Sequence, residues 1–317
     1  MSAAGAGFPL AEALGVAAVL GFVAQTLRIS VPYALGAMGC AYSERGGVIN
    51  IAIEGIFLIS ALAYTLAAYY TGDAWLGVLA AVAAGLATAA LHALVTVTFR
   101  ADQITSGLGI NILAVGLTRF VLKAVFHSSS NSARVEGLAE WRLPGLSAIP
   151  GLGPVLATPL VLVTLALVAA AWWTMFRTPF GLRLRSVGEH PEAAASLGLS
   201  VARLRYAGVL VSGALAGLGG AWLASDQHSF TDQMSAGRGY IALAAMIVGK
   251  WNPLGGALAC LLFGAAETLQ IRLQGSAVPN EFLQMLPYVV TMLVLAGAVG
   301  RARPPAADGV PYDPENH

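Results

Sequence analysis

The residues of this sequence that could do chemistry are polar side chains within long apolar runs. Asn50 and Glu54 lie one helical turn apart at the start of such a run, so both can face the same side of a helix and line a polar path. Asn111 lies in the run that begins "ADQITSGLGI". The alternative is that these side chains hydrogen-bond neighbouring helices and hold a bundle together. Both interpretations stay open from the sequence.

Motifs for covalent or metal chemistry are absent from the 317 residues. The sequence contains no GxxxxGK[ST], HExxH or GxSxG motif, and no Asp, Glu and His cluster has metal-ligand spacing. Cys40 and Cys260 each lie in an apolar stretch without a CxxC partner, which indicates small buried hydrophobes. We therefore expect a chain that is not an enzyme and has no catalytic residue, metal site or cofactor.

The composition predicts an integral membrane protein. Hydrophobic residues make up 57% of the chain and charged residues only 10%, against about 25% charged residues in soluble domains. The mean hydropathy is +0.73. The net charge of +1 offers no basic surface for phosphates and excludes nucleic acid as a partner. The expected surroundings are membrane lipid.

A helix needs about 20 mostly apolar residues to cross the hydrocarbon layer. Eight runs meet this length: 9–28, 51–71, 74–99, 104–126, 156–176, 206–225, 257–273 and 282–300. Two shorter runs, 31–42 and 240–249, are each followed by a polar segment that breaks helices, "SERGGVIN" and "GKWNPLGG". The fold class expected is an all-α polytopic bundle of about eight to ten transmembrane helices with broken or half helices.

The residues beside these breaks are the candidates for a translocation path. We expect it to involve Asn50, Glu54, Asn111, Tyr240, Trp251 and Asn252. Backbone groups freed at a break must be buried in protein or face water, which places polar space near these segments.

Basic residues near the span ends predict the orientation. The loop 177–205 contains five of the 17 basic residues and is placed in the cytoplasm. Ten spans then put both termini in the cytoplasm and the loop 127–155 outside. The transmembrane domain is expected over 1–303, and the tail 304–317 is expected to be disordered.

The stretch "RSVGEHPEAAASLGLSVARLRY", residues 185–206, is a short polar helix between apolar segments. Pro191 suits the first helical position, and Glu189 and Glu192 lie near the positive end of the helix dipole. Gly198 suits a left-handed helix end. A helix over 191–197 is about 10 Å long and does not persist alone in water. It must rest on its own domain or dock into another protein.

This stretch, extended as "GLRLRSVGEHPEAAASLGLSVARLRYAGVLVSGALAGLGGA", resembles the cytoplasmic coupling loop of ABC-importer permeases in the branched-chain amino acid and ribose permease superfamily. Gly188, Ala193, Ala194 and Gly198 match its pattern. Three further segments resemble the same family: "ERGGVINIAIEG", "GRGYIALAAMIVGKWNPLGGALACLLFGAAE" and "PNEFLQMLPYVVTMLVLAG". The residue patterns of these segments are most similar to those of permeases of nucleoside-uptake transporters.

The resemblance implies the membrane subunit of an importer for nucleosides in the bacterial cytoplasmic membrane. ATP would be hydrolysed on a separate ATPase subunit. The implied partners are that ATPase, a second homologous permease and a substrate-binding lipoprotein, with a homodimer of permeases left open. The residues implied to couple to the ATPase are Gly188, Glu189, His190, Pro191, Glu192, Ala193, Ala194 and Gly198.

Two alternatives remain at this point. The same class of transporter could carry a simple sugar or a branched-chain amino acid. An ion-coupled secondary transporter would instead require a paired acid and base at the bilayer midplane and a cytoplasmic loop without a docking helix.

Overall fold

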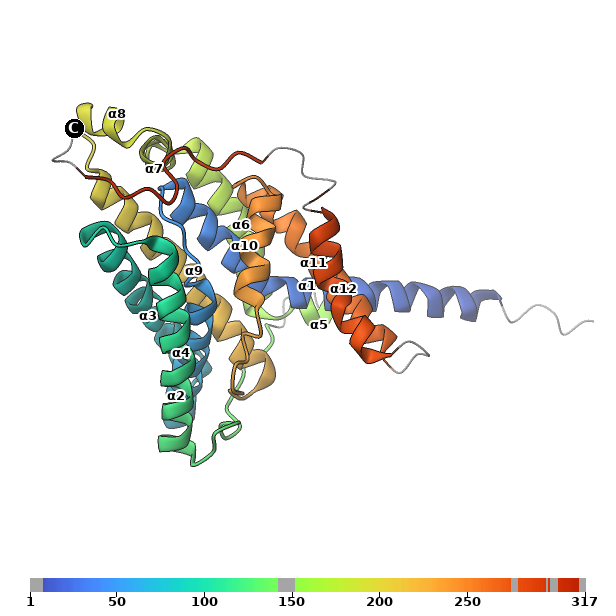
Figure 1. Ribbon diagram of the computed structural model, residues 1–317. Coiled ribbons are helices and arrows are strands. Elements are labelled where there is room, and N and C mark those ends of the chain that lie inside the picture. The colour runs from blue at the N-terminus through green and yellow to red at the C-terminus, as the bar shows by residue number, and fades with distance from the viewer. Residues whose placement is uncertain (1–7, 142–151, 275–278, 295, 297–301, 314–317) are drawn as a thin grey trace, which may run out of the picture.

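A computed structural model describes residues 8–141, 152–274, 279–294, 296 and 302–313 (Figure 1). The helices within these ranges are α1 (Phe8–Arg45), α2 (Ile53–Thr71), α3 (Ala74–Ala93), the π-helix η1 (Leu94–Thr98), α4 (Gln103–Phe126), α5 (Gly153–Leu156), α6 (Pro159–Arg177), α7 (Pro179–Glu189), α8 (Pro191–Ser196), α9 (Val201–Gln227), α10 (Arg238–Val248), α11 (Pro253–Leu273) and α12 (Asn280–Leu293).

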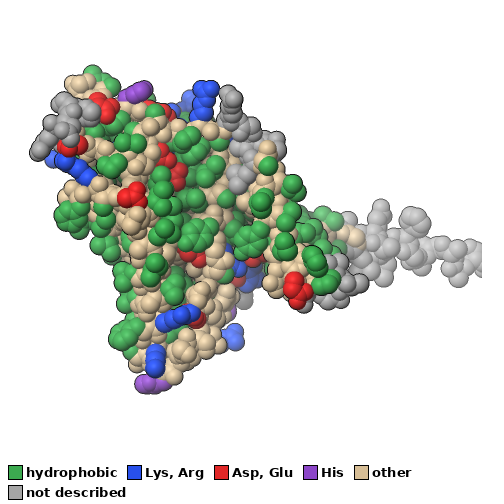
Figure 2. Space-filling model, viewed as in Figure 1, with side chains coloured by type: hydrophobic (Ala, Val, Ile, Leu, Met, Phe, Trp, Pro, Cys, Tyr) green, Lys and Arg blue, Asp and Glu red, His purple; other side chains and the backbone are tan. Residues whose placement is uncertain are grey.

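The bundle is a polytopic membrane fold, as predicted. Seven helices in the described ranges are long and apolar enough to cross a membrane: α1 from Ala17, α2, α3 continued by η1, α4, α6, α9 and α11. Two apolar helices, α10 and α12, are shorter. Hydrophobic side chains cover much of the face formed by α4, α10 and α12 (Figure 2), which suits contact with lipid or with another apolar surface.

The prediction that 9–28 and 31–42 are separate segments is wrong. Both belong to α1, which continues through Pro32 to Arg45. A proline removes one backbone hydrogen bond, but helices in membranes tolerate it where neighbouring helices pack around the site. Two residues before Pro32, the Ser30 hydroxyl donates to the Cys260 carbonyl of α11 at 3.0 Å, so α11 packs at this site. The prediction that both termini lie on the same side assumed ten spans. With one crossing fewer, that argument no longer holds.

Helix α9 is the centre of the bundle and packs against α1, α2 and α3. Its small residues allow this, because a Cβ atom at Gly213 would lie 2.6 Å from the Gly85 carbonyl oxygen of α3. A Cβ atom at Gly217 would lie 2.8 Å from the Val82 Cα atom of the same helix. Without a hydrophobic driving force between helices in lipid, such backbone contact is a main source of packing energy.

The predicted break after 240–249 is confirmed, and it produces a half helix. α10 has 11 residues, and the turn that follows it holds Lys250 and Trp251 with positive φ. The segment before α10 returns from the end of α9 without helix and includes positive φ at Gln233, Ala236 and Gly237. Residues 46–52 form the other break, between α1 and α2.

The two ends of the bundle carry different segments (Figure 1). α7, α8 and the described tail lie at one end, called here the coupling end. The described part of the loop 127–155 lies at the other, where Ser132 and Val135 hydrogen-bond the backbone after α9.

The tail differs from its expected disorder. Residues 304–313 lie packed on the coupling end, where the Ala307 amide donates to the Gly188 carbonyl at 2.9 Å and Asp313 pairs with Arg100 at 2.8 Å. The polar composition of the tail predicted disorder, because composition does not indicate backbone contacts of this kind. Residues 314–317 lie outside the described residues.

We expect Gly213→Val to destabilise the bundle by about 1–3 kcal/mol, because the larger side chain forces α3 and α9 apart. Thermal unfolding in detergent measures the loss. Gly116→Val is the matched control, since a Cβ atom there meets nothing within 4 Å. Equal unfolding temperatures for the two variants would contradict the role of this contact.

Candidate functional site

The predicted cytoplasmic loop is a pair of short helices, α7 and α8. Thr178 caps α7 by accepting a hydrogen bond from the Gly181 amide, and Pro179 occupies the first turn. His190 separates the two helices with φ −142° and ψ 83°. The prediction of α8 did not include α7, although Thr178 and Pro179 give α7 the same kind of start signal that Pro191 gives α8.

Helix α8 has the ends predicted for it. Pro191 is its first residue, and Gly198 has φ +81° with its amide donating to the Ala195 carbonyl. Ala194 points inward and packs with Val187 and Val201.

The outer surface of α8 is formed by Glu192, Ala193 and Ser196. Leu197 follows directly and is 82% exposed. A protruding leucine at a polar tip suits insertion into a groove of a partner. Leu197 was not among the predicted site residues, because it is not part of the motif that the sequence matches.

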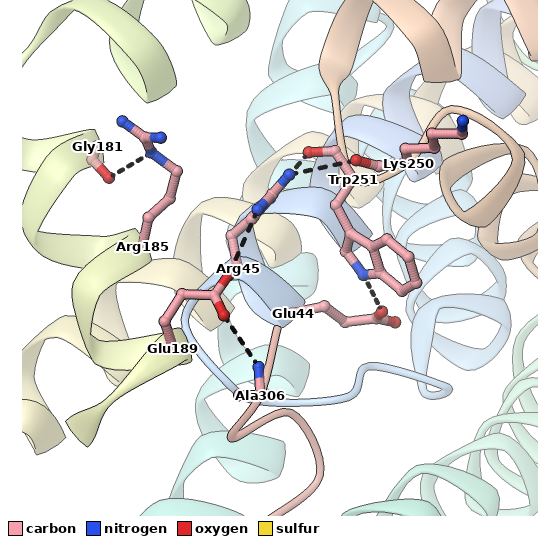
Figure 3. Close-up of polar contacts among 8 residues, drawn as sticks. All are labelled: Glu44, Arg45, Gly181, Arg185, Glu189, Lys250, Trp251 and Ala306. Carbon is pink, nitrogen blue, oxygen red and sulfur yellow. Dashed lines mark hydrogen bonds and ion pairs between the residues drawn. The ribbon is translucent and has the colours of Figure 1, made fainter. Parts of the chain in front are cut away.

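Gly188 permits a close contact between α7 and the end of α1. A Cβ atom there would overlap the Arg45 carbonyl at the end of α1. The neighbouring Glu189 carboxylate lies 3.8 Å from the Arg45 guanidinium and accepts a hydrogen bond from the Ala306 amide at 3.2 Å (Figure 3). These contacts fasten the end of α7 to α1 and to the tail.

Arg45 extends the connection to the turn between α10 and α11. Its guanidinium donates to the carbonyl oxygens of Trp251 at 3.1 Å and Lys250 at 3.2 Å (Figure 3). The Trp251 indole in turn donates to the buried Glu44 carboxylate at 2.7 Å. Trp251 therefore lies at the coupling end, where it contacts Arg45 and Glu44. Asn252 is also there and caps α11 by accepting from the Leu254 amide.

Three of the six path candidates meet in one cavity. Glu54, Asn111 and Tyr240 line a space of about 570 Å³ between α2, α4 and the start of α10. The Asn111 amide group donates to the Tyr240 hydroxyl at 3.1 Å and to the Ile51 carbonyl at 3.0 Å. Its oxygen accepts from the Gly55 amide. Asn111 thus both faces the cavity and connects the helices around it.

Glu54 caps the half helix. Its two carboxylate oxygens accept from the amides of Gly237 at 2.8 Å and Gly239 at 2.6 Å, which satisfies amide groups that have no partner within α10. On the other side of this start, Arg238 pairs with Glu267 of α11 at 3.3 Å. Carboxylates from two helices therefore hold the first turn of α10.

Asn50 is fully buried and donates to the Ser212 hydroxyl of α9 at 2.9 Å. It does not line the cavity of Glu54, Asn111 and Tyr240. The structure thus brings Asn50 to the bundle interior and places Trp251 and Asn252 at the coupling end.

Asp308 of the tail lies in a buried ionic cluster that no sequence pattern indicated. It hydrogen-bonds the Glu44 carboxyl and lies near the Arg205 guanidinium, a side chain only 1% exposed. Burial raises the pKa of Asp308 to about 7, although the hydrogen bond from Glu44 and the charge of Arg205 act in the opposite direction. A contact between two carboxyl groups requires one shared proton, which fits this direction.

A bundle of membrane-spanning helices with a half helix, a cavity beside it that holds a few polar groups, and a helix pair outside the spans is the architecture of a multi-pass membrane permease. The chain belongs to the family described as the permease component of the branched-chain amino acid transport system, whose family model matches residues 22–295.

Two known permeases are similar in sequence to this protein over most of its length. It is 42% identical to the guanosine ABC transporter permease protein NupQ of Bacillus subtilis, over 92% of this chain and 95% of that protein. It is 43% identical to the nucleoside ABC transporter permease protein NupC of Lactococcus lactis, over 92% and 96%. A solved ABC transporter in an inward-facing conformation has the same fold, with a TM-score of 0.51 and 15% identity over 93% of this chain and 91% of that one.

Family membership decides between the classes of transporter considered. The chain is an ABC transporter permease and not an ion-coupled secondary transporter. An acid and base pair, Glu267 with Arg238, is nevertheless present. In this structure it joins α11 to the start of α10.

We expect Glu54→Ala to loosen the start of α10, with a loss of about 2 kcal/mol, because two amides lose a charged acceptor. Hydrogen exchange of the peptide covering 237–245 should accelerate. Asp102→Ala is the matched control, since Asp102 caps α4 from an exposed position where water replaces it. Faster exchange in α4 than in α10 would contradict the assignment.

The Asp308 cluster makes docking of the tail depend on pH. The pKa of Asp308 is 3.8 when the tail is released and about 7 when it is docked. Between these two pH values the docked carboxyl is therefore protonated, while the released carboxyl is not. Docking therefore weakens as pH rises from about 4 through 7.

A spin label on Val310→Cys measures this, because Val310 is exposed while Cys40 and Cys260 are buried. We expect greater label mobility at pH 8 than at pH 6. Adding Asp308→Asn should remove the difference, because the amide does not titrate and its oxygen can still accept the hydrogen bond from Glu44. A pH response that persists in the Asp308→Asn chain would show that another group is responsible.

Proposed function

We propose that this chain is the permease subunit of an ABC importer that carries nucleosides, with ATP hydrolysed on a separate subunit. The observation that carries the proposal is 42–43% identity, over nearly full length, to two permeases named for guanosine and nucleoside transport. The lack of a phosphate-binding GxxxxGK[ST] motif supports a separate ATPase.

The cavity between α2, α4 and α10 supports a neutral, hydroxylated solute. Its polar groups include the Tyr240 hydroxyl, the Asn111 amide and the Glu54 carboxylate, and both Glu54 oxygens already accept backbone amides. No cationic side chain is among the described residues that line it, so the carboxylate of an amino acid would lack a counter-charge. Nucleosides offer hydroxyls and a base that can lie on the Tyr240 ring. A sugar remains the second candidate, because the chain is 30% identical to a putative glucose ABC transporter permease of Haloferax volcanii.

We propose that α8 docks into the ATPase subunit through Leu197 and the outer residues Glu192, Ala193 and Ser196. Gly188, Glu189, His190, Pro191, Ala194 and Gly198 then act by shaping and supporting α8. Under this proposal the coupling end and the tail lie in the bacterial cytoplasm.

A second homologous permease is the proposed partner across the face of α4. That helix is the least buried of the candidate spans, and its Ile112 beside the cavity is 74% exposed. The path then forms between two subunits and receives solute from a substrate-binding lipoprotein outside.

We expect Leu197→Asp to abolish most association with the ATPase, because a charge replaces the apolar tip of α8. Co-purification of the assembled subunits measures it. Val310→Asp is a matched control, since Val310 is also an exposed aliphatic residue at the coupling end and only its backbone is used. Undiminished association of the Leu197→Asp chain would refute docking through α8.

We expect Tyr240→Phe to raise the KM of nucleoside uptake about two- to tenfold, because one hydroxyl leaves the cavity. Uptake of labelled guanosine and labelled ribose by the assembled transporter separates nucleoside from sugar. Tyr69→Phe, in the outer half of α2 beside Phe126, should leave KM unchanged. Ribose uptake without guanosine uptake would replace the nucleoside assignment.

A further inference from the structure

The tail segment (residues 302–313) contacts both coupling helices. On α7, the Ala307 amide donates to the Gly188 carbonyl at 2.9 Å and the Ala306 amide donates to Glu189 at 3.2 Å. On α8, Tyr312 packs against the small cluster of Val187, Ala194 and Val201 that holds the inner side of the helix. α8 has six residues, and a helix of that length is unstable alone. It rests on Val187 and Val201, and Tyr312 lies at the edge of this cluster.

The same segment also contacts three parts of the membrane bundle. Asp308 bonds to Glu44 at the end of α1. The Arg205 guanidinium at the start of α9 donates to the Val310 carbonyl at 2.9 Å. Asp313 pairs with Arg100, in the connection between η1 and α4, at 2.8 Å.

The fit of the segment is tight at its turn. Gly309 has φ +79°, a conformation that side chains disfavour, and a Cβ atom there would lie 2.9 Å from Ile49 Cδ1. Ile49 lies in the break 46–52 that leads into α2, and its carbonyl bonds His92 of α3. The turn at Gly309 thus reaches the same break that precedes Glu54 and the cavity.

We propose that the tail segment is part of the coupling apparatus, transmitting the movement of α7 and α8 to α1, α9 and the break 46–52. This inference rests on the proposed ATPase-driven function. The backbone of residues 306–312 and the side chains of Asp308 and Tyr312 are the positioning groups, and they touch neither ATP nor solute. The Glu189–Arg45 ion pair also joins α7 to α1, but at 3.8 Å it connects them only weakly. The contacts of the tail add to this connection.

Gly309→Val tests the proposal by displacing the turn of the tail. The valine meets Ile49 and requires a strained backbone, so the tail should leave its site. Val310→Ala is the matched control, because the Val310 side chain is exposed and only its carbonyl accepts a bond. A chain ending at Arg303 is the second variant, and it removes the segment without relying on strain.

The measurements use the full transporter with its ATPase and partner subunits in lipid vesicles. First, the ratio of solute taken up to ATP hydrolysed should fall about fivefold or more in both tail variants, while co-purification of the ATPase stays unchanged. Second, a spin label at Ile112→Cys, beside the cavity, should respond to ATP in the parent chain and respond less in the tail variants. A purely stabilising tail would lower the amount of assembled complex without changing either readout per complex.

Equal coupling ratios and equal label responses in all four chains would overturn the proposal. The second readout needs no solute. If the label at position 112 responds to ATP but nucleosides are not transported, the nucleoside assignment fails and the role of the tail stands. If nucleosides are transported with the parent coupling ratio in both tail variants, the role of the tail fails and the nucleoside assignment stands.

Discussion

A helix that begins inside a membrane must find partners for its first amide groups, because lipid offers none. In this protein Glu54 supplies them for α10 by accepting from Gly237 and Gly239. The requirement explains why a carboxylate stands in an apolar segment. It also fixes where α2 lies relative to α10, and so it shapes the cavity between them.

A second constraint joins the cavity to the coupling end. Gly188 brings α7 against the backbone of α1, and Arg45 then bonds both Glu189 and the turn at Lys250 and Trp251. That turn ends α10, whose first residues lie at the cavity. One half helix of 11 residues therefore begins at the cavity and ends at the turn that Arg45 links to Glu189 of α7. A single short element thus connects the cavity with the network around Arg45.

The sequence predicted those features that depend on local chemistry. Pro191 and Gly198 bound α8 because each residue suits one helix end. The chain breaks between α10 and α11 because Gly249, Asn252 and Pro253 disfavour a continuous helix. Features that depend on distant packing were not predictable. Pro32 remained within α1 because neighbouring helices support it, and Trp251 lies away from the cavity because its partner is Glu44, 207 residues earlier. The docked tail belongs to the same group, since its polar composition is also typical of unstructured ends.

The position of the tail has a practical consequence for handling the protein. Asp313 lies beside Arg100 at the coupling end, and the preceding Tyr312 packs on the cluster under α8. A fluorescent protein or affinity tag joined there by a short linker would crowd the exposed tip at Leu197. Fusions are better inserted in the loop at the opposite end of the bundle (Figure 1), where they leave that tip free.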